Sequence, residues 1–216
     1  MKRWALLTVA LYIVFLSLLA LPMFLATREK DNPAELVSVF YVWIAPVLIL
    51  AQAVLLLVPL AVARERPVKR RGILASGIIS GIVMAAMTLL FVSFIFLMIL
   101  GENNDRWDWG GGWAFFAVLV GILWSVWGIV FWKGYSSQDP QAFISRMTHW
   151  LLRGSILELL VAVPSHIISR RRDECCAPPI TLLGIAAGLS VAVLSFGPGV
   201  FFLFAKRIRD KKGRTA

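Results

Sequence analysis

The stretch Gly72–Gly101, with the sequence GILASGIISGIVMAAMTLLFVSFIFLMILG, contains no charged side chain. About 20 apolar residues are enough for a helix to cross the hydrocarbon core of a bilayer. Lipid offers the backbone no hydrogen-bond partners, so a segment inside it must pair its own N–H and C=O groups, as a helix does. The stretch therefore predicts a transmembrane helix.

Runs of the same kind occur along the whole chain. Uncharged runs long enough to span a bilayer are also found at Trp4–Thr27, Leu36–Ala63, Trp109–Trp132 and Cys175–Ala205. A further segment, His149–Ser169, is interrupted by charged and polar residues, and it either crosses the bilayer or lies along its surface as an amphipathic helix. We expect an all-α polytopic membrane protein, a single domain of residues 1–216 with about six spans near 4–27, 36–62, 72–100, 110–132, 149–169 and 179–205.

The composition supports this class. Of the 216 residues, 59% are hydrophobic and 16% are charged, whereas a soluble domain has roughly 45–50% apolar and about 25% charged residues. A water-soluble globule of this length has too much surface to hide the apolar excess. The net charge of +10 lies in short clusters between the apolar runs, which suits contact with anionic lipid head groups. The sequence has no basic stripe interleaved with aromatic residues, so we expect no nucleic-acid partner.

The distribution of basic residues predicts an orientation. Lys and Arg accumulate on the cytoplasmic side of membrane proteins. Six crossings with the N-terminus inside place most of them there, including those of 64–71 and of the C-terminal tail, although the run Arg170–Arg172 falls outside. We expect both termini in the cytoplasm. Because no glycosylation sequon or retention tail is present, we expect a bacterial-type plasma (inner) membrane.

Small residues recur at every fourth position in two of the expected spans. The two stripes are Gly77, Gly81 and Ala85, and Gly184, Gly188 and Ala192. Small residues at this spacing allow helix backbones to approach closely. Either stripe packs within the chain or forms a homo- or hetero-oligomer with another subunit.

The two glycine stripes belong to a longer pattern. Val58-Pro59, Gly77-Ile78 and the Phe-rich run 94–97 are echoed, at approximately the same spacing, by Val163-Pro164, Gly184-Ile185 and the Phe-rich run 201–204. A three-span unit that occurs twice would be inverted in the membrane, an arrangement that many transporters use. The sequence thus raises the hypothesis of a weak 3+3 inverted repeat. Near its end, Gly197-Pro198-Gly199 either loosens a helix terminus or breaks the helix and exposes carbonyl groups.

Glu158 is the acidic residue well inside an expected span. A charged carboxylate in mid-bilayer costs ~2.5–3.5 kcal/mol, so it should be paired, protonated or in contact with water. Arg153 precedes it by five residues and falls on a different helical face, so a partner from another helix is expected. Ala162, Ser165 and His166 share the face of Glu158. A carboxyl group beside a histidine could relay protons, and the alternatives are a structural hydrogen bond or the polar side of an interfacial helix.

Cys175 and Cys176 precede Ala177-Pro178-Pro179, which predicts that the thiols lie at a helix N-terminus. The helix end and Arg170–Arg172 favour the thiolate form. Thiolates bind soft metal ions such as Cu(I), Zn or Hg, and His166 could add a nitrogen ligand. The alternatives are small buried residues or a lipidation site. Locally, the pair and its apolar helix resemble the cysteine-pair span of small mercury-transport membrane proteins, but the other cysteine motifs of that family are missing here.

Two functions agree with these patterns. Nucleophile-elbow, zinc-helix, Walker and dinucleotide motifs are absent from the sequence, so nothing specifies an enzyme. The first function is a small transporter or channel-like protein, with a polar or thiol site near the outer end of the fifth and sixth spans. The second is a non-catalytic accessory or assembly subunit of a membrane complex.

Overall fold

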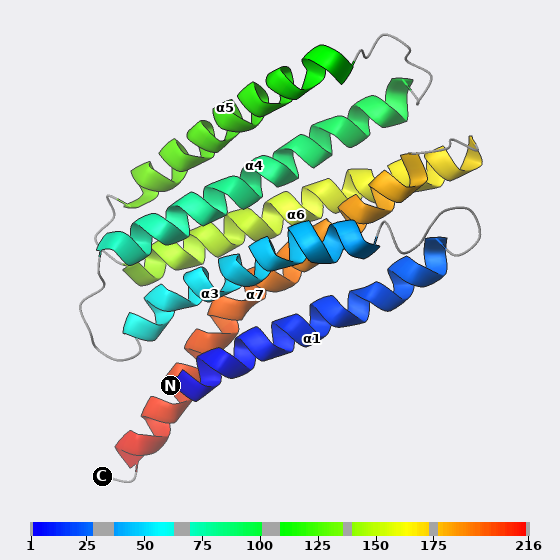
Figure 1. Cartoon of the computed structure of the whole chain (residues 1–216). Coiled ribbons are helices and arrows are strands. Elements are labelled where there is room, and N and C mark those ends of the chain that lie inside the picture. The colour runs from blue at the N-terminus through cyan, green and yellow to red at the C-terminus, as the bar shows by residue number, and fades with distance from the viewer. Residues whose placement is uncertain are drawn as a thin grey trace.

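The computed structural model describes residues 2–27, 37–62, 70–100, 109–135, 140–172 and 177–214 (Figure 1). Apart from a turn at Arg172, these residues are all helical, and no strand occurs among them. The elements are α1 (Lys2–Thr27), a short π-helix η1 (Phe40–Ile44) that leads into α3 (Ala45–Val62), α4 (Arg70–Leu100), α5 (Trp109–Tyr135), α6 (Pro140–Arg171) and α7 (Ala177–Arg214).

Within these residues, five helical segments are long and apolar enough to cross a bilayer. They are Arg3–Leu25, Val37–Ala61, Arg71–Ile99, Ala142–Arg171 and Ala177–Phe201. A sixth, shorter apolar segment lies in α5 at Ala117–Phe131. The predicted all-helical, multi-pass class is therefore confirmed.

Two of the helices are longer than the sequence predicted. α6 begins at Pro140 rather than near 149. Proline is well suited to a first helical turn, because the N–H that it lacks would have no partner within the helix there. α6 also packs against α3, α4 and α7, so it runs through the bundle and not along its surface. α7 continues past 205 to Arg214, and Gly197-Pro198-Gly199 stays helical within it.

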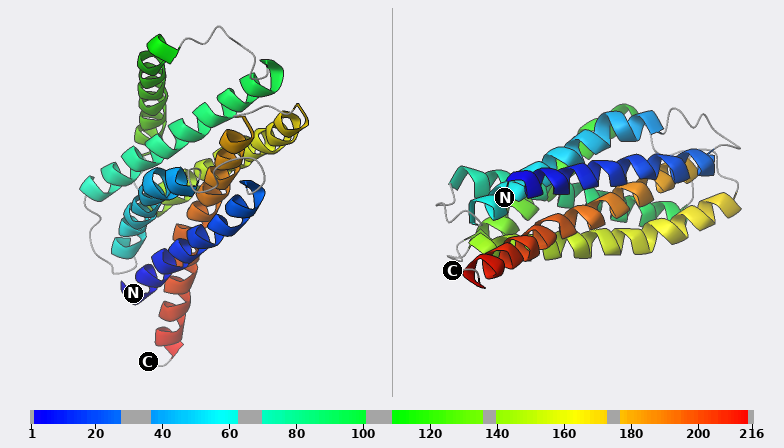
Figure 2. Two further views of the ribbon diagram at one scale, coloured as in Figure 1. Left: turned by 45° about the vertical axis from the view of Figure 1, so that its right-hand side comes forward. Right: turned by 90° about the horizontal axis from the view of Figure 1, so that it is seen from below.

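Consecutive helices run in opposite directions through the bundle (Figures 1 and 2). α5 and α1 lie at opposite edges, with α5 against α4 and α1 against α7 and α3. The most extensive contact joins α6 to α7, and the next joins α4 to α6. α4, α6 and α7 thus form the centre of the fold.

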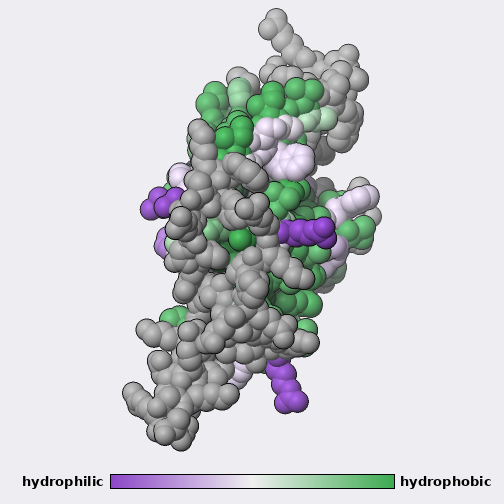
Figure 3. Space-filling model, turned by 90° about the vertical axis from the view of Figure 1, so that its left-hand side faces the viewer, coloured by the Kyte–Doolittle hydropathy of each residue, from purple (hydrophilic) through white to green (hydrophobic). Residues whose placement is uncertain are grey.

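The outside of the bundle is apolar. Large hydrophobic side chains project from most of the helices, with Leu18 63%, Trp43 72% and Leu203 70% exposed. Figure 3 shows hydrophobic side chains over much of the described surface on one face, with few hydrophilic ones between them. Helices that are apolar on nearly all sides belong in the core of a protein or in lipid. Because these side chains are on the outside, lipid is the environment that covers them.

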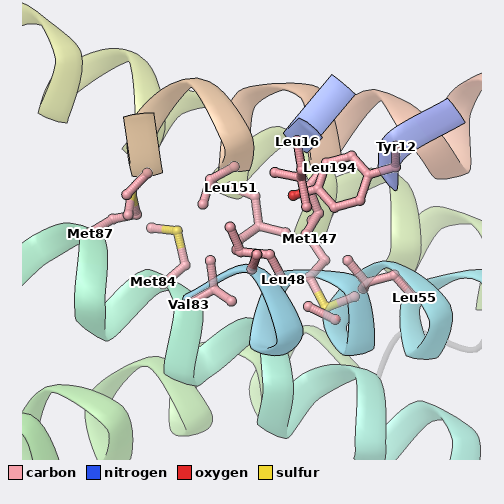
Figure 4. Close-up of a cluster of buried hydrophobic side chains, with 14 of the residues drawn as sticks. Tyr12, Leu16, Leu48, Leu55, Val83, Met84, Met87, Met147, Leu151 and Leu194 are labelled. Carbon is pink, nitrogen blue, oxygen red and sulfur yellow. The ribbon is translucent and has the colours of Figure 1, made fainter. Parts of the chain in front are cut away.

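The inside of the bundle is a packed apolar cluster with a few polar anchors. Leu16, Leu48, Met147, Leu151 and Leu194 come from four helices and meet there, each at most 4% exposed (Figure 4).

Three side-chain hydrogen bonds among the described residues connect the outer helices α1 and α5 to their neighbours. The Tyr12 hydroxyl donates to the Ser190 carbonyl at 3.0 Å and joins α1 to α7. The Tyr41 hydroxyl donates to the carbonyl of Leu16 and joins η1 to α1. The Trp127 indole N–H donates to Thr88 Oγ1 at 3.1 Å and joins α5 to α4.

Candidate functional site

One face of α6 carries polar and small side chains through the centre of the bundle. Its members alternate in steps of three and four residues, which places them on one side of a helix. Each is at most 1% exposed, and we call the set the α6 polar seam: Ser155, Glu158, Ala162, Ser165 and Ser169. Glu158 is near the middle of the apolar segment Ala142–Arg171. Helical spacing in the sequence predicts one face for Glu158, Ala162 and Ser165, and the structure brings them together there.

Two glycines of α7 make the room for the Glu158 carboxylate. A Cβ atom at Gly188 would overlap Glu158 Oε2 and lie 2.9 Å from Leu159 Cγ. A Cβ atom at Gly184 would lie 3.2 Å from Glu158 Oε1 and would overlap the Phe94 ring. The carboxylate therefore lies directly against the α7 backbone. We call this place the Gly184–Gly188 notch.

The carboxylate has no partner in the part of the chain that the structure describes. Glu158 is 0% exposed, and neither of its oxygens has a hydrogen-bond partner among the described residues. The interhelical partner predicted from the sequence is thus not found there. Arg153 is exposed, which agrees with its place on a different face of α6. Buried polar groups are normally hydrogen-bonded, so an unpaired carboxyl group in the middle of an apolar bundle requires an explanation.

The hydroxyl groups near Glu158 mostly bond to their own helices. Ser155 Oγ donates to the Leu152 carbonyl at 2.9 Å, and Ser169 Oγ donates to the His166 carbonyl at 3.1 Å. Ser165 Oγ, in contrast, is buried without a partner among the described residues. Ser165 and Glu158 are therefore the two groups of the seam whose side-chain oxygens make no hydrogen bond among the described residues.

His166 pairs with α7 and not with Glu158. Its Nδ1 lies 2.9 Å from Thr181 Oγ1, while the Thr181 hydroxyl donates to the Ala177 carbonyl at 2.9 Å. A hydroxyl group has one hydrogen, so Nδ1 of the neutral ring is the donor and Nε2 is left as an acceptor. His166 follows Glu158 by eight residues, about 12 Å along the helix. The direct carboxyl–histidine pair considered from the sequence is therefore not formed.

The two glycine stripes lie in different surroundings. Gly184 and Gly188 face the inside, as the notch shows. In α4, Gly81 would place a Cβ 3.2 Å from Trp124 Cδ1 of α5, while a Cβ at Gly77 would meet nothing within 4 Å. Gly77 borders a groove of about 690 Å³ between α4, α5 and α6 whose lining is mostly apolar. Of the two alanines, Ala85 is buried and Ala192 is half-buried.

The predicted thiol site cannot be placed. Cys175 and Cys176 lie outside the described residues, which end at Arg172 and resume at Ala177. Among the described residues, no group of three His, Cys, Asp or Glu side chains could hold a metal ion. The soft-metal site therefore stays a prediction.

Sequence reasoning missed Gln52, a second long polar side chain in the centre. Gln52 of α3 is 1% exposed, and its Oε1 has no partner among the described residues. Its amide lies against Gly197 of α7, where a Cβ atom would overlap Nε2. Gln52 was overlooked because it lies in an uncharged run, where hydropathy alone does not say which residues face the inside.

In comparisons with known proteins, no family model, no curated protein and no solved structure matches this chain. The fold and its exposed apolar surface define the class of protein. It is a multi-pass helical membrane protein, and a buried carboxyl group and a buried amide lie against the backbone of its last helix.

Proposed function

We propose that this chain is a small transporter or channel-like protein that moves a proton or an alkali cation across the membrane, with Glu158 as the group that binds the ion. One observation carries the proposal: a fully buried carboxyl group, with both oxygens unpartnered among the described residues, lies in a notch of two glycines. The same buried face of α6 holds Ser165, whose hydroxyl makes no hydrogen bond in the described part of the chain.

A structural role for Glu158 would lead to a different environment. A carboxyl group that serves only to hold two helices together donates to or accepts from a neighbouring group, because the unpaired state is costly in lipid. An ionised carboxylate in mid-bilayer costs ~2.5–3.5 kcal/mol. Binding a proton or a cation removes that cost. Loading and unloading therefore change the free energy of the buried state, and such a difference is what couples a ligand to a conformational change.

The chemistry of the notch favours a hard cation over a soft metal. A carboxylate and hydroxyl oxygens are ligands for protons and hard cations, whereas thiolates and imidazoles select soft or borderline metals. The predicted Cys175-Cys176 site would therefore be separate from the Glu158 site. We place Glu158 near the middle of the membrane and the thiols near its outer surface.

Ion flux into proteoliposomes tests the proposal. The purified protein is reconstituted, and uptake of H⁺, Na⁺ and K⁺ is followed with ion-sensitive dyes under an imposed gradient. We expect wild-type flux of at least one of these ions, and a loss of about tenfold or more in Glu158→Gln, because the amide cannot bind a cation by charge. Arg153→Gln is the matched control, since Arg153 is exposed on another face of α6. Equal flux in wild type and Glu158→Gln contradicts the proposal.

A second function, the assembly subunit, is favoured by the groove beside Gly77. A glycine with open space around it, next to an apolar groove of about 690 Å³, leaves room for a helix of another protein. On this alternative, purification in mild detergent recovers a stoichiometric partner, and Gly77→Leu releases it. Gly184→Leu is not a clean test of assembly, because the added side chain would meet Phe94 and Glu158 of the same chain.

A further inference from the structure

We infer that the groove between α4, α5 and α6 is a binding site for an anionic phospholipid, with one acyl chain in the groove and the phosphate at Arg71. The inference goes beyond the proposed function, because it involves neither Glu158 nor the Gly184–Gly188 notch. It also gives the groove an occupant other than the partner helix of the assembly alternative. The lining of the groove, its length and its charge support this occupant.

The groove lies at one end of the bundle, and apolar side chains form most of it. The start of α4, the end of α5 and the start of α6 are at this end (Figure 1). Ile73, Phe131 and Phe143 come from these three helices, line the groove and are each at most 6% exposed, so they form its inner side. Because the surface of the bundle at this depth faces lipid, the groove opens toward lipid. The lining residues that are at least 41% exposed are Leu74, Ile78 and Trp124.

Two glycines leave room for a hydrocarbon chain. Gly77 of α4 and Gly128 of α5 line the groove, and a Cβ atom at either position would meet nothing within 4 Å. Ser125 also lines the groove, but its hydroxyl donates to the Gly121 carbonyl at 2.7 Å. An occupant of this part of the groove therefore gains from close apolar contact and needs no hydrogen-bond partner, as is true of an acyl chain.

The length of the groove fits one leaflet of the bilayer. Its α4 residues extend from Arg71, where the apolar segment of α4 begins, to Ile78, which corresponds to about 10 Å along the helix. Just beyond, a Cβ atom at Gly81 would lie 3.2 Å from Trp124 Cδ1 and 3.7 Å from Gly128 N, so α4 and α5 touch there. The hydrocarbon core of a bilayer is about 30 Å thick, and one leaflet contributes about half of it. A single acyl chain stays within that half, whereas a partner helix that crosses the bilayer would extend past the point where α4 and α5 close the groove.

The membrane-surface end of the groove is positively charged. Among the described residues that line the groove, Arg71 carries a charge and none is acidic. α4 begins at Arg70, and the N–H groups of its first turn, which have no partner within the helix, favour a phosphate at the same end. In the sequence, five of the eight residues 64–71 are Lys or Arg and one is acidic. Such a cluster attracts anionic head groups and repels the ammonium group of a zwitterionic one.

A lipid in the groove connects α5 to the rest of the bundle. α5 contacts α4 and, to a smaller extent, α6. An acyl chain in the groove contacts Phe131 of α5, Phe143 of α6 and Ile73 of α4 at once, because all three line it. The bound lipid therefore stabilises the position of α5, and α5 should exchange its amide hydrogens more slowly when the lipid is present.

The test measures which phospholipid stays bound to the full chain. The purified protein is delipidated and reconstituted into nanodiscs of phosphatidylcholine with or without phosphatidylglycerol. It is then released into mild detergent, and the bound lipid is identified and counted by native mass spectrometry. Hydrogen exchange of α5 in the nanodiscs is the second measurement.

Three variants and two controls enter this test. Gly128→Leu fills the groove, Gly77→Leu fills it from the facing helix where the first variant does not insert, and Arg71→Gln removes the charge. Gly121→Leu is the control for added bulk, because Gly121 is an equally open glycine of α5 that does not line the groove. Arg171→Gln is the control for charge, because Arg171 is exposed at the far end of α6.

We expect the wild type to retain phosphatidylglycerol over phosphatidylcholine by about tenfold or more. Arg71→Gln should reduce this preference about fivefold, the factor expected for one basic side chain near an anionic surface. Gly128→Leu should lose bound lipid of both kinds, while the two controls bind as wild type does. Phosphatidylglycerol should slow hydrogen exchange of α5 in the wild type but not in Gly128→Leu.

Equal retention of the two lipids by the wild type overturns the inference of an anionic ligand. Wild-type retention in Gly128→Leu or Gly77→Leu, or an equal loss of lipid in Gly121→Leu, overturns the inference of a site in the groove. A stoichiometric protein partner in place of lipid, released by Gly128→Leu, overturns it in favour of the assembly subunit. None of these results depends on cation flux, so they are distinguishable from failure of the proposed function.

Discussion

At the scale of single residues, the account depends on glycines that leave room for polar side chains. Gly188 and Gly197 are buried in α7 because the groups of Glu158 and Gln52 occupy the space that their Cβ atoms would fill. Glycine in a helix costs roughly 0.5–1 kcal/mol relative to alanine. Glycine at these two positions allows a polar side chain to lie in close contact with the helix backbone.

Gly188→Ala should therefore be destabilising although alanine is the better helix former. The added methyl group overlaps Glu158 Oε2 and forces the carboxyl group or α6 to move, at a cost of about 1–3 kcal/mol for overpacking. We expect a lower midpoint of thermal unfolding in detergent and reduced cation flux.

Gly77→Ala is the matched control, because a Cβ at that position meets nothing within 4 Å. It should be neutral or stabilising by up to about 1 kcal/mol. If Gly188→Ala is as stable and as active as Gly77→Ala, the notch has no importance for the carboxyl group.

The residue scale also shows what could be predicted from the sequence. The shared face of Glu158, Ala162 and Ser165 follows from helical periodicity alone. The bond from His166 to Thr181 does not, because it depends on how α6 and α7 are aligned relative to each other. The lack of a described partner for Glu158 could not be predicted either, since a single sequence does not say which groups lie opposite a given side chain.

At the scale of elements, uncharged runs identified where helices occur but not where they end. α6 extends back to Pro140 through Arg146, and α7 continues through a charged tail to Arg214. A charged residue ends the apolar run without ending the helix, because the helix can continue into the head-group region or into water. Helix ends therefore have to be taken from the structure.

Individual hydrogen bonds hold the outer helices to the central ones, and their contributions can be measured. Tyr12→Phe removes the bond between α1 and the Ser190 carbonyl. Hydrogen bonds between transmembrane helices contribute about 0.6 kcal/mol on average and at most about 1.7 kcal/mol. We expect a small decrease in the free energy of unfolding, measured by denaturation in mixed micelles, with flux retained. A loss greater than about 3 kcal/mol would mean that the hydroxyl has another role.

α5, like α1, is an outer helix of the bundle. It contacts α4 and, to a smaller extent, α6, and it stands apart from the bundle in the left view of Figure 2. Trp127→Phe removes its bond to Thr88. We expect faster hydrogen exchange in α5 than in wild type, with α6 and α7 unchanged. Equal exchange rates in wild type and variant would show that apolar packing alone positions α5.

At the scale of the whole molecule, the two three-helix units that the sequence suggested stay a prediction. The echo of prolines, glycines and phenylalanines was only approximate in the sequence. What the sequence did not reveal was that Gln52 is buried against α7, since a polar residue in an uncharged run can face either lipid or the inside of the bundle.

The orientation that the distribution of charge predicts can be tested with the two cysteines. If six helices cross and both termini are cytoplasmic, Cys175 and Cys176 are on the outer side of the membrane. We expect a membrane-impermeant maleimide to label them in intact cells. The double variant with Cys175→Ser and Cys176→Ser should not be labelled. Labelling only after the cells are opened would reverse the orientation.

The central claim is that Glu158 is a buried carboxyl group that exchanges a proton or a cation. Modification by a membrane-permeant carbodiimide, located by mass spectrometry of the reconstituted protein, tests it most directly. We predict modification at Glu158 that decreases as the pH is raised and as Na⁺ or K⁺ is added, because only the protonated and unoccupied group reacts. Modification that does not change with pH or with either cation would contradict the claim.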